Sequence, residues 1–430
     1  MESIYYPKLD ETVHSHVCQN GLTVRVVHRP GFTRKMAYFV TDFGAVHTDF
    51  ELDGKTYHVP AGIAHFLEHK MFELQGRDVS AEFAALGANV NAFTSYDMTA
   101  YYFTCSENFR ESLALLLEFV STPYFPEESV QREMGIIDQE IGMYQDTPDS
   151  QVFENLMQCM YGNHPIRVPI LGNRESIREI TPELLNLCHR AFYTPANMIL
   201  CVVGDVDAQE IAELADKVLG TEKRPVGRKL RPWQEEMRAQ KPVCQSNMEV
   251  AMPTFQMALK AEPEPMGEGA ARMEIVGDLA AEALFGESSE LYLELYEKGL
   301  IDSSFGGGYE SVDGCAMLTC GGDSEDASAI RAALIKRAAE IAEAGIPEAD
   351  FLRMKRSALG RRIRGLDSFD STCFRLCAYH FAEFDYFVFP SVYPDVTAAE
   401  VCAFLKETVH PSRCALSLLY PKTNPKEVSQ

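Results

Sequence analysis

The chain has 430 residues, a length that predicts two domains rather than one, because single hydrophobic cores rarely grow beyond about 250–300 residues. Its 46% hydrophobic and 24% charged residues are typical of a folded globular protein and exclude wholesale disorder. Lys and Arg total 39 against 63 Asp and Glu. The resulting net charge of −24 repels phosphate backbones, so we expect no nucleic-acid partner.

No segment of the sequence is suited to crossing or entering a membrane. The longest apolar runs, such as Leu113–Leu117 and Met198–Val203, are much shorter than the roughly 20 residues that a membrane helix needs. The first residues lack a basic region followed by an apolar stretch, so we expect no secretory signal. The 12 cysteines form no disulfide framework, and the close pair Cys373 and Cys377 has no second pair to complete a zinc site. We expect the cysteines to be reduced, buried thiols. We also expect no membrane partner and a cytoplasmic location.

The first part of the chain mixes strand and helix patterns. Strands are expected at 22–28, 36–41, 88–94, 99–105 and 198–203, and helices at 61–72, 106–120, 129–144, 182–192 and 208–219. Residues 221–243 are polar, locally basic and interrupted by three prolines and Gly227. This composition predicts a linker, with docking of an acidic partner as the alternative.

The part after the linker repeats the order of the first. Strands are expected at 248–259, 304–310, 315–320 and 414–420, and helices at 272–285, 327–344, 347–364, 371–384 and from 401. Each part contains, near its end, a helix, a short Pro-containing turn and a buried strand, which indicates duplication. We therefore predict an α+β protein of two similar α/β halves, each an antiparallel sheet packed with helices, with domains at 1–220 and 244–430.

A metal-binding motif stands in the helix expected at 61–72. His65 and His69 are four residues apart, so both imidazoles lie on one helix face and can reach the same ion, with Glu68 beside them. The order inverts the His-Glu-x-x-His motif of zinc peptidases, and imidazole with carboxylate ligands suits Zn²⁺. The alternative is a pair of unconnected histidines beside a solvated glutamate. A third ligand is expected from the helix 129–144, which carries Glu133, Asp138 and Glu140.

These residues resemble the insulinase/pitrilysin-like metallopeptidases, which include the mitochondrial processing peptidases. The resemblance covers most of residues 20–215, and it is closest to the bacterial cytoplasmic branch with a single zinc motif. It rests on the segments 65–69, 87–94, 99–103, 132–140, 164–172, 193–198 and 203–206. It implies half of a clamshell, one Zn²⁺ per chain held by His65, His69 and Glu140, and Glu133 in an outer shell.

The same resemblance implies a zinc-dependent endopeptidase that hydrolyses unfolded peptides, with Glu68 as the general base acting on a zinc-activated water. The segment 89–94 is suited to pairing with an extended peptide, and we expect Asn91, Ala92 and Phe93 to bind it. Asn91 and Ala92 match the family's substrate-binding strand.

The second half departs from the family pattern. An Arg and a Tyr that reach the substrate are expected there, but Tyr296 stands near the Arg position, and Asp302 or Ser303 near the Tyr position. Tyr309 is a possible substitute, although an ordinary strand residue is the simpler interpretation. The second half also lacks an inverted zinc motif. We therefore expect a homodimer or a heterodimer with a related subunit. Two alternatives to an active endopeptidase stay open: a zinc-retaining, weakly active or non-catalytic structural subunit, and an acidic interaction protein.

Overall fold

The computed structural model describes residues 1–422 and divides into two compact units. The first unit comprises Met1–Ile141, Pro169–Pro232 and Arg362–Phe389, and the second comprises Gly142–Val168, Trp233–Arg361 and the remaining C-terminal residues. Each unit therefore includes a segment from the other part of the chain. The division into domains at 1–220 and 244–430 with a linker between them stays a prediction. Within residues 1–422, no helix is long and apolar enough to span a bilayer.

The first unit is built on a seven-stranded sheet in the order β1-β2-β3-β11-β4-β10-β9. Every neighbouring pair is antiparallel except β3 and β11. The strands of this sheet are β1 (Glu2–Tyr6), β2 (Glu11–Val17), β3 (Thr23–His28), β4 (Lys35–Thr41), β9 (Asn89–Thr94), β10 (Thr99–Cys105) and β11 (Met198–Gly204). Two smaller sheets contain β5 (Asp49–Leu52), β6 (Lys55–His58) and β12 (Arg228–Lys229), and β7 (Glu73–Leu74) and β8 (Arg77–Asp78).

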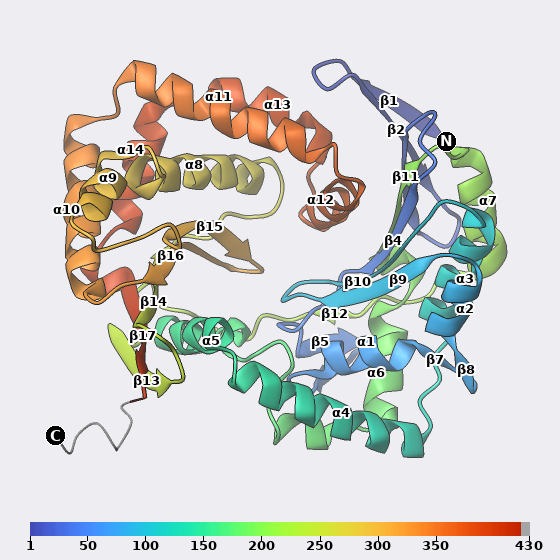
Figure 1. Ribbon diagram of the computed structural model, residues 1–430. Helices are drawn as coiled ribbons and strands as arrows, with labels where there is room; N and C mark the ends of the chain where they lie inside the picture. Colours follow the sequence, from blue (N-terminus) through green and yellow to red (C-terminus); the bar gives the residue numbers. More distant parts are fainter. Residues whose placement is uncertain (423–430) are drawn as a thin grey trace. The chain divides into compact units, whose positions relative to one another are not determined.

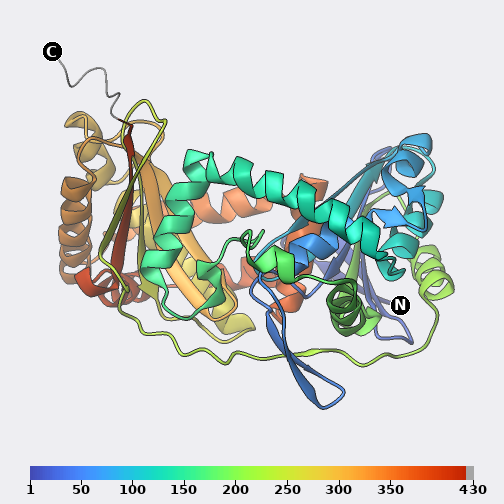
Figure 2. The ribbon, with the colours of Figure 1, turned by 90° about the horizontal axis from the view of Figure 1, so that it is seen from below.

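Helices cover both faces of this sheet (Figures 1 and 2). On one face, α3 contacts β10 and β4, and α7 contacts β3; on the other, α12 contacts β11 and β4. The helices of the unit are α1 (Ile63–Met71), α2 (Val79–Ala85), α3 (Phe109–Ser121), α4 (Glu127–Gln145, which runs into the second unit), α6 (Pro182–Phe192), α7 (Ala208–Leu219) and α12 (Phe369–Phe381). Tyr38 of β4 donates a 2.5 Å hydrogen bond to Asp370, which fixes α12 to the sheet.

The second unit has a five-stranded sheet in the order β13-β17-β14-β16-β15. Only β13 and β17 pair in parallel, at the position that β3 and β11 occupy in the first sheet. The strands are β13 (Val243–Met248), β14 (Thr254–Ala261), β15 (Gly306–Val312), β16 (Cys315–Asp323) and β17 (Cys414–Pro421). The shared order and directions confirm the predicted α+β fold of two similar halves.

The sheet of the second unit also packs against helices, including one from the first part of the chain. The α5 helix contacts β17, β14 and β13, whereas α8 contacts β15. The helices are α5 (Pro148–Met160), α8 (Glu268–Phe285), α9 (Glu290–Glu297), α10 (Ala327–Ala344), α11 (Glu348–Gly365), α13 (Phe389–Val392, at the unit boundary) and α14 (Ala398–Thr408).

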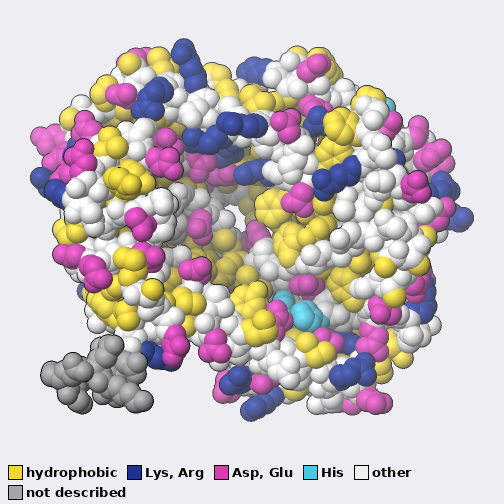
Figure 3. Space-filling view, in the orientation of Figure 1, with side chains coloured by type: hydrophobic (Ala, Val, Ile, Leu, Met, Phe, Trp, Pro, Cys, Tyr) yellow, Lys and Arg dark blue, Asp and Glu magenta, His cyan; other side chains and the backbone are white. Residues whose placement is uncertain are grey.

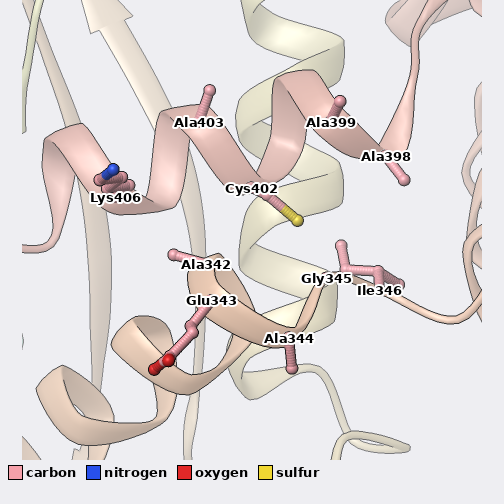
Figure 4. A pocket seen from close by; sticks show the side chains of 10 residues that line it. All are labelled: Ala342, Glu343, Ala344, Gly345, Ile346, Ala398, Ala399, Cys402, Ala403 and Lys406. Atoms are coloured by element: carbon pink, nitrogen blue, oxygen red, sulfur yellow. The ribbon is translucent and has the colours of Figure 1, made fainter.

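A pocket of the second unit lies between the end of α10 and α14 (Figure 4). Small side chains line most of it, and its charged lining residues are Glu343 and Lys406. None of the metal-site residues predicted from the sequence lines this pocket.

Candidate metal centre

The helix α1 carries three of the predicted site residues and begins after an obligatory glycine. Gly62 has a φ of +90°, and a Cβ atom there would lie 2.4 Å from the carbonyl oxygen of Leu171, so other residues would both strain the backbone and clash. His65 and His69 follow on one face of the helix, with their ring centroids 4.5 Å apart. The close contact between Gly62 and Leu171 thus fixes the start of α1, and with it the positions of His65 and His69.

The helix α4 brings Glu140 to this pair. Its Oε2 lies 3.7 Å from Nε2 of His65 and 3.5 Å from Nε2 of His69. One ligand atom from each of the three residues lies within 4.8 Å of the others. The Glu140 Oε2 atom is buried and receives no hydrogen bond in the described part of the chain. Ligand atoms around a tetrahedral Zn²⁺ at about 2.0–2.1 Å are about 3.3 Å apart, so this donor set fits zinc.

The other two acidic residues singled out on α4 lie in different surroundings. Glu133 Oε1 lies 2.9 Å from Nδ1 of His69, the ring nitrogen that does not face Glu140. Asp138 Oδ1 instead lies 3.2 Å from Nε of Arg174. The structure therefore brings Glu133 and Glu140 to the histidines and leaves Asp138 outside the cluster.

Glu68 lies on the same helix turn and is only 8% exposed. Thr94 Oγ1 donates a 2.6 Å hydrogen bond to its Oε2 atom. Burial raises the pKa of Glu68, although the hydrogen bond from Thr94 opposes this. Thr94 was not predicted as a site residue; its one indication in the sequence was its place at the end of the segment 89–94, which was expected to pair with a peptide.

The two imidazoles differ in their electrostatic environment. Burial lowers the pKa of His65 to about 3, so this ring is neutral and keeps a lone pair for a metal near pH 7. For His69, burial also lowers the pKa, but the hydrogen bond with Glu133 and the charges of Glu68 and Glu140 outweigh it and raise the pKa. Three carboxylates around two imidazoles favour a divalent cation. In Figure 3, histidine side chains reach the surface beside acidic ones, in the region where Figure 1 draws α1 and α4.

The residues expected to bind peptide lie on β9, which is an edge strand of the first sheet. The backbone N–H of Ala92 donates 2.9 Å to the side-chain oxygen of its neighbour Asn91 rather than to another strand. The ring of Phe93 packs against Tyr102 and against Phe374 of α12, with centroids 6.2 and 6.0 Å apart. The strand therefore has an open edge at Ala92 and an aromatic wall at Phe93.

The residues considered in place of the family's Arg and Tyr lie in the second unit. Tyr296 is 54% exposed on α9, stacked on Tyr292. Asp302 accepts hydrogen bonds from the backbone and side chain of Ser304, and Ser303 is exposed beside it. Tyr309 of β15 packs edge-on against Phe404 of α14. These contacts give Tyr309 the packing of an ordinary sheet residue.

Comparison with known proteins finds family models and relatives that match this chain. A model described as Insulinase (Peptidase family M16) matches residues 56–174, and one described as Peptidase M16 inactive domain matches residues 179–358. The Bacillus subtilis protein YmfH, described as an uncharacterized zinc protease, is 35% identical over 433 residues, covering 98% of this chain and 100% of its own.

Solved structures agree with this relationship. An M16-like peptidase from Alicyclobacillus acidocaldarius has a TM-score of 0.92 at 32% identity, covering 96% of this chain and 99% of its own. Pitrilysin shares the fold, with a TM-score of 0.79 at 16% identity over 98% of this chain but only 46% of its own. The chain therefore belongs to the M16 family of insulinase- and pitrilysin-type peptidases.

Proposed function

We propose that the protein is a zinc-dependent endopeptidase acting on unfolded peptides. The observation that carries this proposal is the convergence of Nε2 of His65, Nε2 of His69 and the buried Oε2 of Glu140, which has no hydrogen-bond partner within residues 1–422. His65, His69 and Glu140 would hold one Zn²⁺ per chain, with Glu133 orienting His69 from outside. The zinc protease names of relatives support the same metal.

Zinc, when bound, polarises a substrate carbonyl and makes a water molecule acidic enough to lose a proton near neutral pH. Glu68 is the group placed to accept that proton and to return it to the leaving amine. Thr94 orients the Glu68 carboxylate through its 2.6 Å hydrogen bond to Oε2. A buried carboxylate beside the metal ligands supports a role as base rather than as a surface charge.

The open edge of β9 supports a substrate with an extended backbone. A peptide that pairs with β9 would replace the Asn91 side chain as the partner of the Ala92 N–H. Folded proteins rarely offer such a strand, whereas unfolded chains do. Asn91, Ala92 and Phe93 are therefore our proposed peptide-binding residues.

We further propose that the active assembly contains a second M16 chain, either another copy or a related subunit. Pitrilysin matches over only 46% of its own length, so its single chain is about twice as long as this one. The exposed Tyr296, where the resemblance leads one to expect Arg, also favours help from a partner. The 12 free cysteines support a reducing compartment, and we propose the cytoplasm.

The test compares wild type, Glu68→Gln and the matched control Glu82→Gln, whose carboxylate is paired with Arg77 on the surface. Each is assayed on a quenched unstructured peptide, alone and with related subunits from the same organism, and its zinc content is measured. We expect Glu68→Gln to retain zinc and lose about 10²–10⁴-fold in rate, and Glu82→Gln to behave as wild type. If wild type and Glu68→Gln were equally inert with every partner, the zinc-retaining structural subunit would replace this proposal.

A further inference from the structure

A second group of metal-ligating side chains lies in the first unit, between β2 and α7. His16 is near the end of β2, Cys18 follows that strand directly, and Asp216 stands in the last turn of α7. One ligand atom from each residue lies within 4.8 Å of the other two. Cys18 is only 3% exposed, and the other two side chains are partly buried.

The backbone around this group is tied together by several hydrogen bonds. The N–H of Cys18 donates 2.8 Å to the carbonyl of Leu22, which closes a tight turn. Asn20, within that turn, donates 2.6 Å from its side chain to the carbonyl of Gly220. The N–H of Gly220 in turn donates 3.0 Å to the carbonyl of Asp216. The turn that follows Cys18 is thus attached to the helix end that carries Asp216.

The position also suits a cation electrostatically. Oδ1 of Asp216 is buried and has no hydrogen-bond partner of ordinary geometry among the described residues, and the polar neighbour of this carboxylate is the Cys18 thiol. The C-terminal turn of a helix carries a partial negative charge from its carbonyl groups and therefore favours positive charge. A bound cation would satisfy both the oxygen and the helix end.

We propose that His16, Cys18 and Asp216 form a second, structural site for a thiophilic divalent metal of the Zn²⁺ class. A nitrogen, a sulfur and an oxygen donor suit zinc, whereas Mg²⁺ and Ca²⁺ prefer oxygen ligands alone. The site shares no residue with the His65 and His69 cluster. Its ion would join β2 to α7 and so stabilise the side of the sheet that begins with the N-terminal strands.

Metal binding here must displace a proton. Burial, the charge of Asp216 and a hydrogen bond between the Cys18 thiol and the Asp216 carboxylate raise the pKa of Cys18 to about 12, so the thiol carries its hydrogen near pH 7. When the metal–sulfur bond forms, the S–H bond breaks and the proton passes to solvent. No oxidant or reductant is involved.

The test uses the full chain with His65→Ala and His69→Ala, so that the proposed peptidase site is absent and cannot contribute. Co²⁺ is the probe, because a cobalt–thiolate bond gives a near-ultraviolet charge-transfer band that histidine and carboxylate ligands alone do not give. We expect the band to saturate at one Co²⁺ per chain and Zn²⁺ to abolish it. Adding Cys18→Ser should remove the band, whereas Cys105→Ser, at another buried cysteine of the same unit, should retain it.

Two further variants keep the test decisive if Cys18→Ser does not fold. Asp216→Asn and His16→Ala retain the thiol and should each weaken Co²⁺ binding at least about tenfold, with unchanged circular dichroism. Zn²⁺ should also raise the Tm of the parent variant but not that of Asp216→Asn. The proposal is overturned if the folded, reduced parent shows no thiolate band with a few-fold excess of Co²⁺, or if the band survives loss of Cys18.

Discussion

Oε1 of Glu133 lies 2.9 Å from Nδ1 of His69, while Nε2 of the same ring faces Glu140 at 3.5 Å. Glu133 thus holds Nδ1 and leaves Nε2 free for a metal. We expect Glu133→Gln to weaken zinc binding about 10–100-fold without unfolding the chain, because the amide holds the imidazole less firmly. Competition with a chromogenic chelator measures this loss.

The control for Glu133 is on the same helix. Asp138→Asn changes a carboxylate that pairs with Arg174 instead of a histidine, so zinc affinity should stay within about twofold. Equal losses in the two variants would contradict a specific role for Glu133.

Lys70 connects the two helices of the proposed site. Its buried ammonium group donates 2.7 Å to Glu73 and also donates to Ser129 in the first turn of α4. Lys70→Met removes the donor and should lower the free energy of unfolding by about 2 kcal/mol. Because the anchor of α4 is lost, zinc affinity should fall too. Urea unfolding and chelator competition measure the two effects.

Arg132 provides the comparison, since it contacts the same Glu73 carboxylate from the surface at 3.1 Å, with 59% of its side chain exposed. Arg132→Ala should cost less than about 1 kcal/mol and leave zinc affinity unchanged. A Lys70 variant as stable as the Arg132 variant would show that α4 is positioned by other contacts.

Stability of the second unit should depend on pH through Glu235. This carboxylate accepts hydrogen bonds from the Lys260 ammonium at 2.8 Å and from the three N–H groups of residues 162–164. Burial raises its pKa, but these donors outweigh burial and lower the pKa to about 2. The folded pKa lies below the ordinary value of about 4.3, so the stabilisation is present above that value and is lost as the pH falls towards 2.

Glu235→Gln should therefore lower the free energy of unfolding on the order of 3 kcal/mol at pH 7, because Lys260 remains buried beside a neutral partner. Denaturant unfolding should show a smaller gap between wild type and variant at pH 3. The exposed neighbour Glu236 gives a control, Glu236→Gln, that should change stability little at either pH. A gap that widens on acidification would refute the role of the Glu235 charge.

The edge of β9 makes a prediction about substrate binding. Ala92→Pro removes the N–H that the strand offers to a peptide, and this N–H donates to the side chain of Asn91 in the free protein. Loss of one hydrogen bond of about 1 kcal/mol should lower kcat/KM about fivefold, with zinc content and Tm unchanged. Peptide kinetics test this, and an unaltered kcat/KM in a folded variant would argue that peptides bind elsewhere.

Local pattern predicted much of the fold. The bounds of α6, α7 and α10 agree with the helices expected from apolar spacing and caps. The hairpin of β5 and β6 was missed because its strands are only four residues long, and α5 was missed altogether. The strand expected at 248–259 is β14, which begins later, at Thr254, and β13 before it was missed because it alternates exposed and half-buried residues and lacks a buried apolar run.

The parts of the site that lie on one helix could be predicted from the sequence, whereas the contacts between different elements could not. His65, Glu68 and His69 share one helix, so their neighbourhood follows from the helical repeat. The choice among the carboxylates of α4 depends on how α4 lies against α1, and spacing alone left it open. The Thr94 hydrogen bond to Glu68 likewise joins a strand and a helix, and no local pattern contains that information.

The contacts of α12 with β4 and β11 have a consequence for biosynthesis. One face of the first sheet stays bare on the ribosome until residue 381 has emerged, long after the strands themselves have been translated. The nascent chain therefore exposes an incompletely covered sheet face from the completion of β11 at Gly204 until α12 has been made, and a gene cut at the linker would encode a fragment that still exposes it. Folding of the first unit is thereby coupled to near-completion of the whole polypeptide.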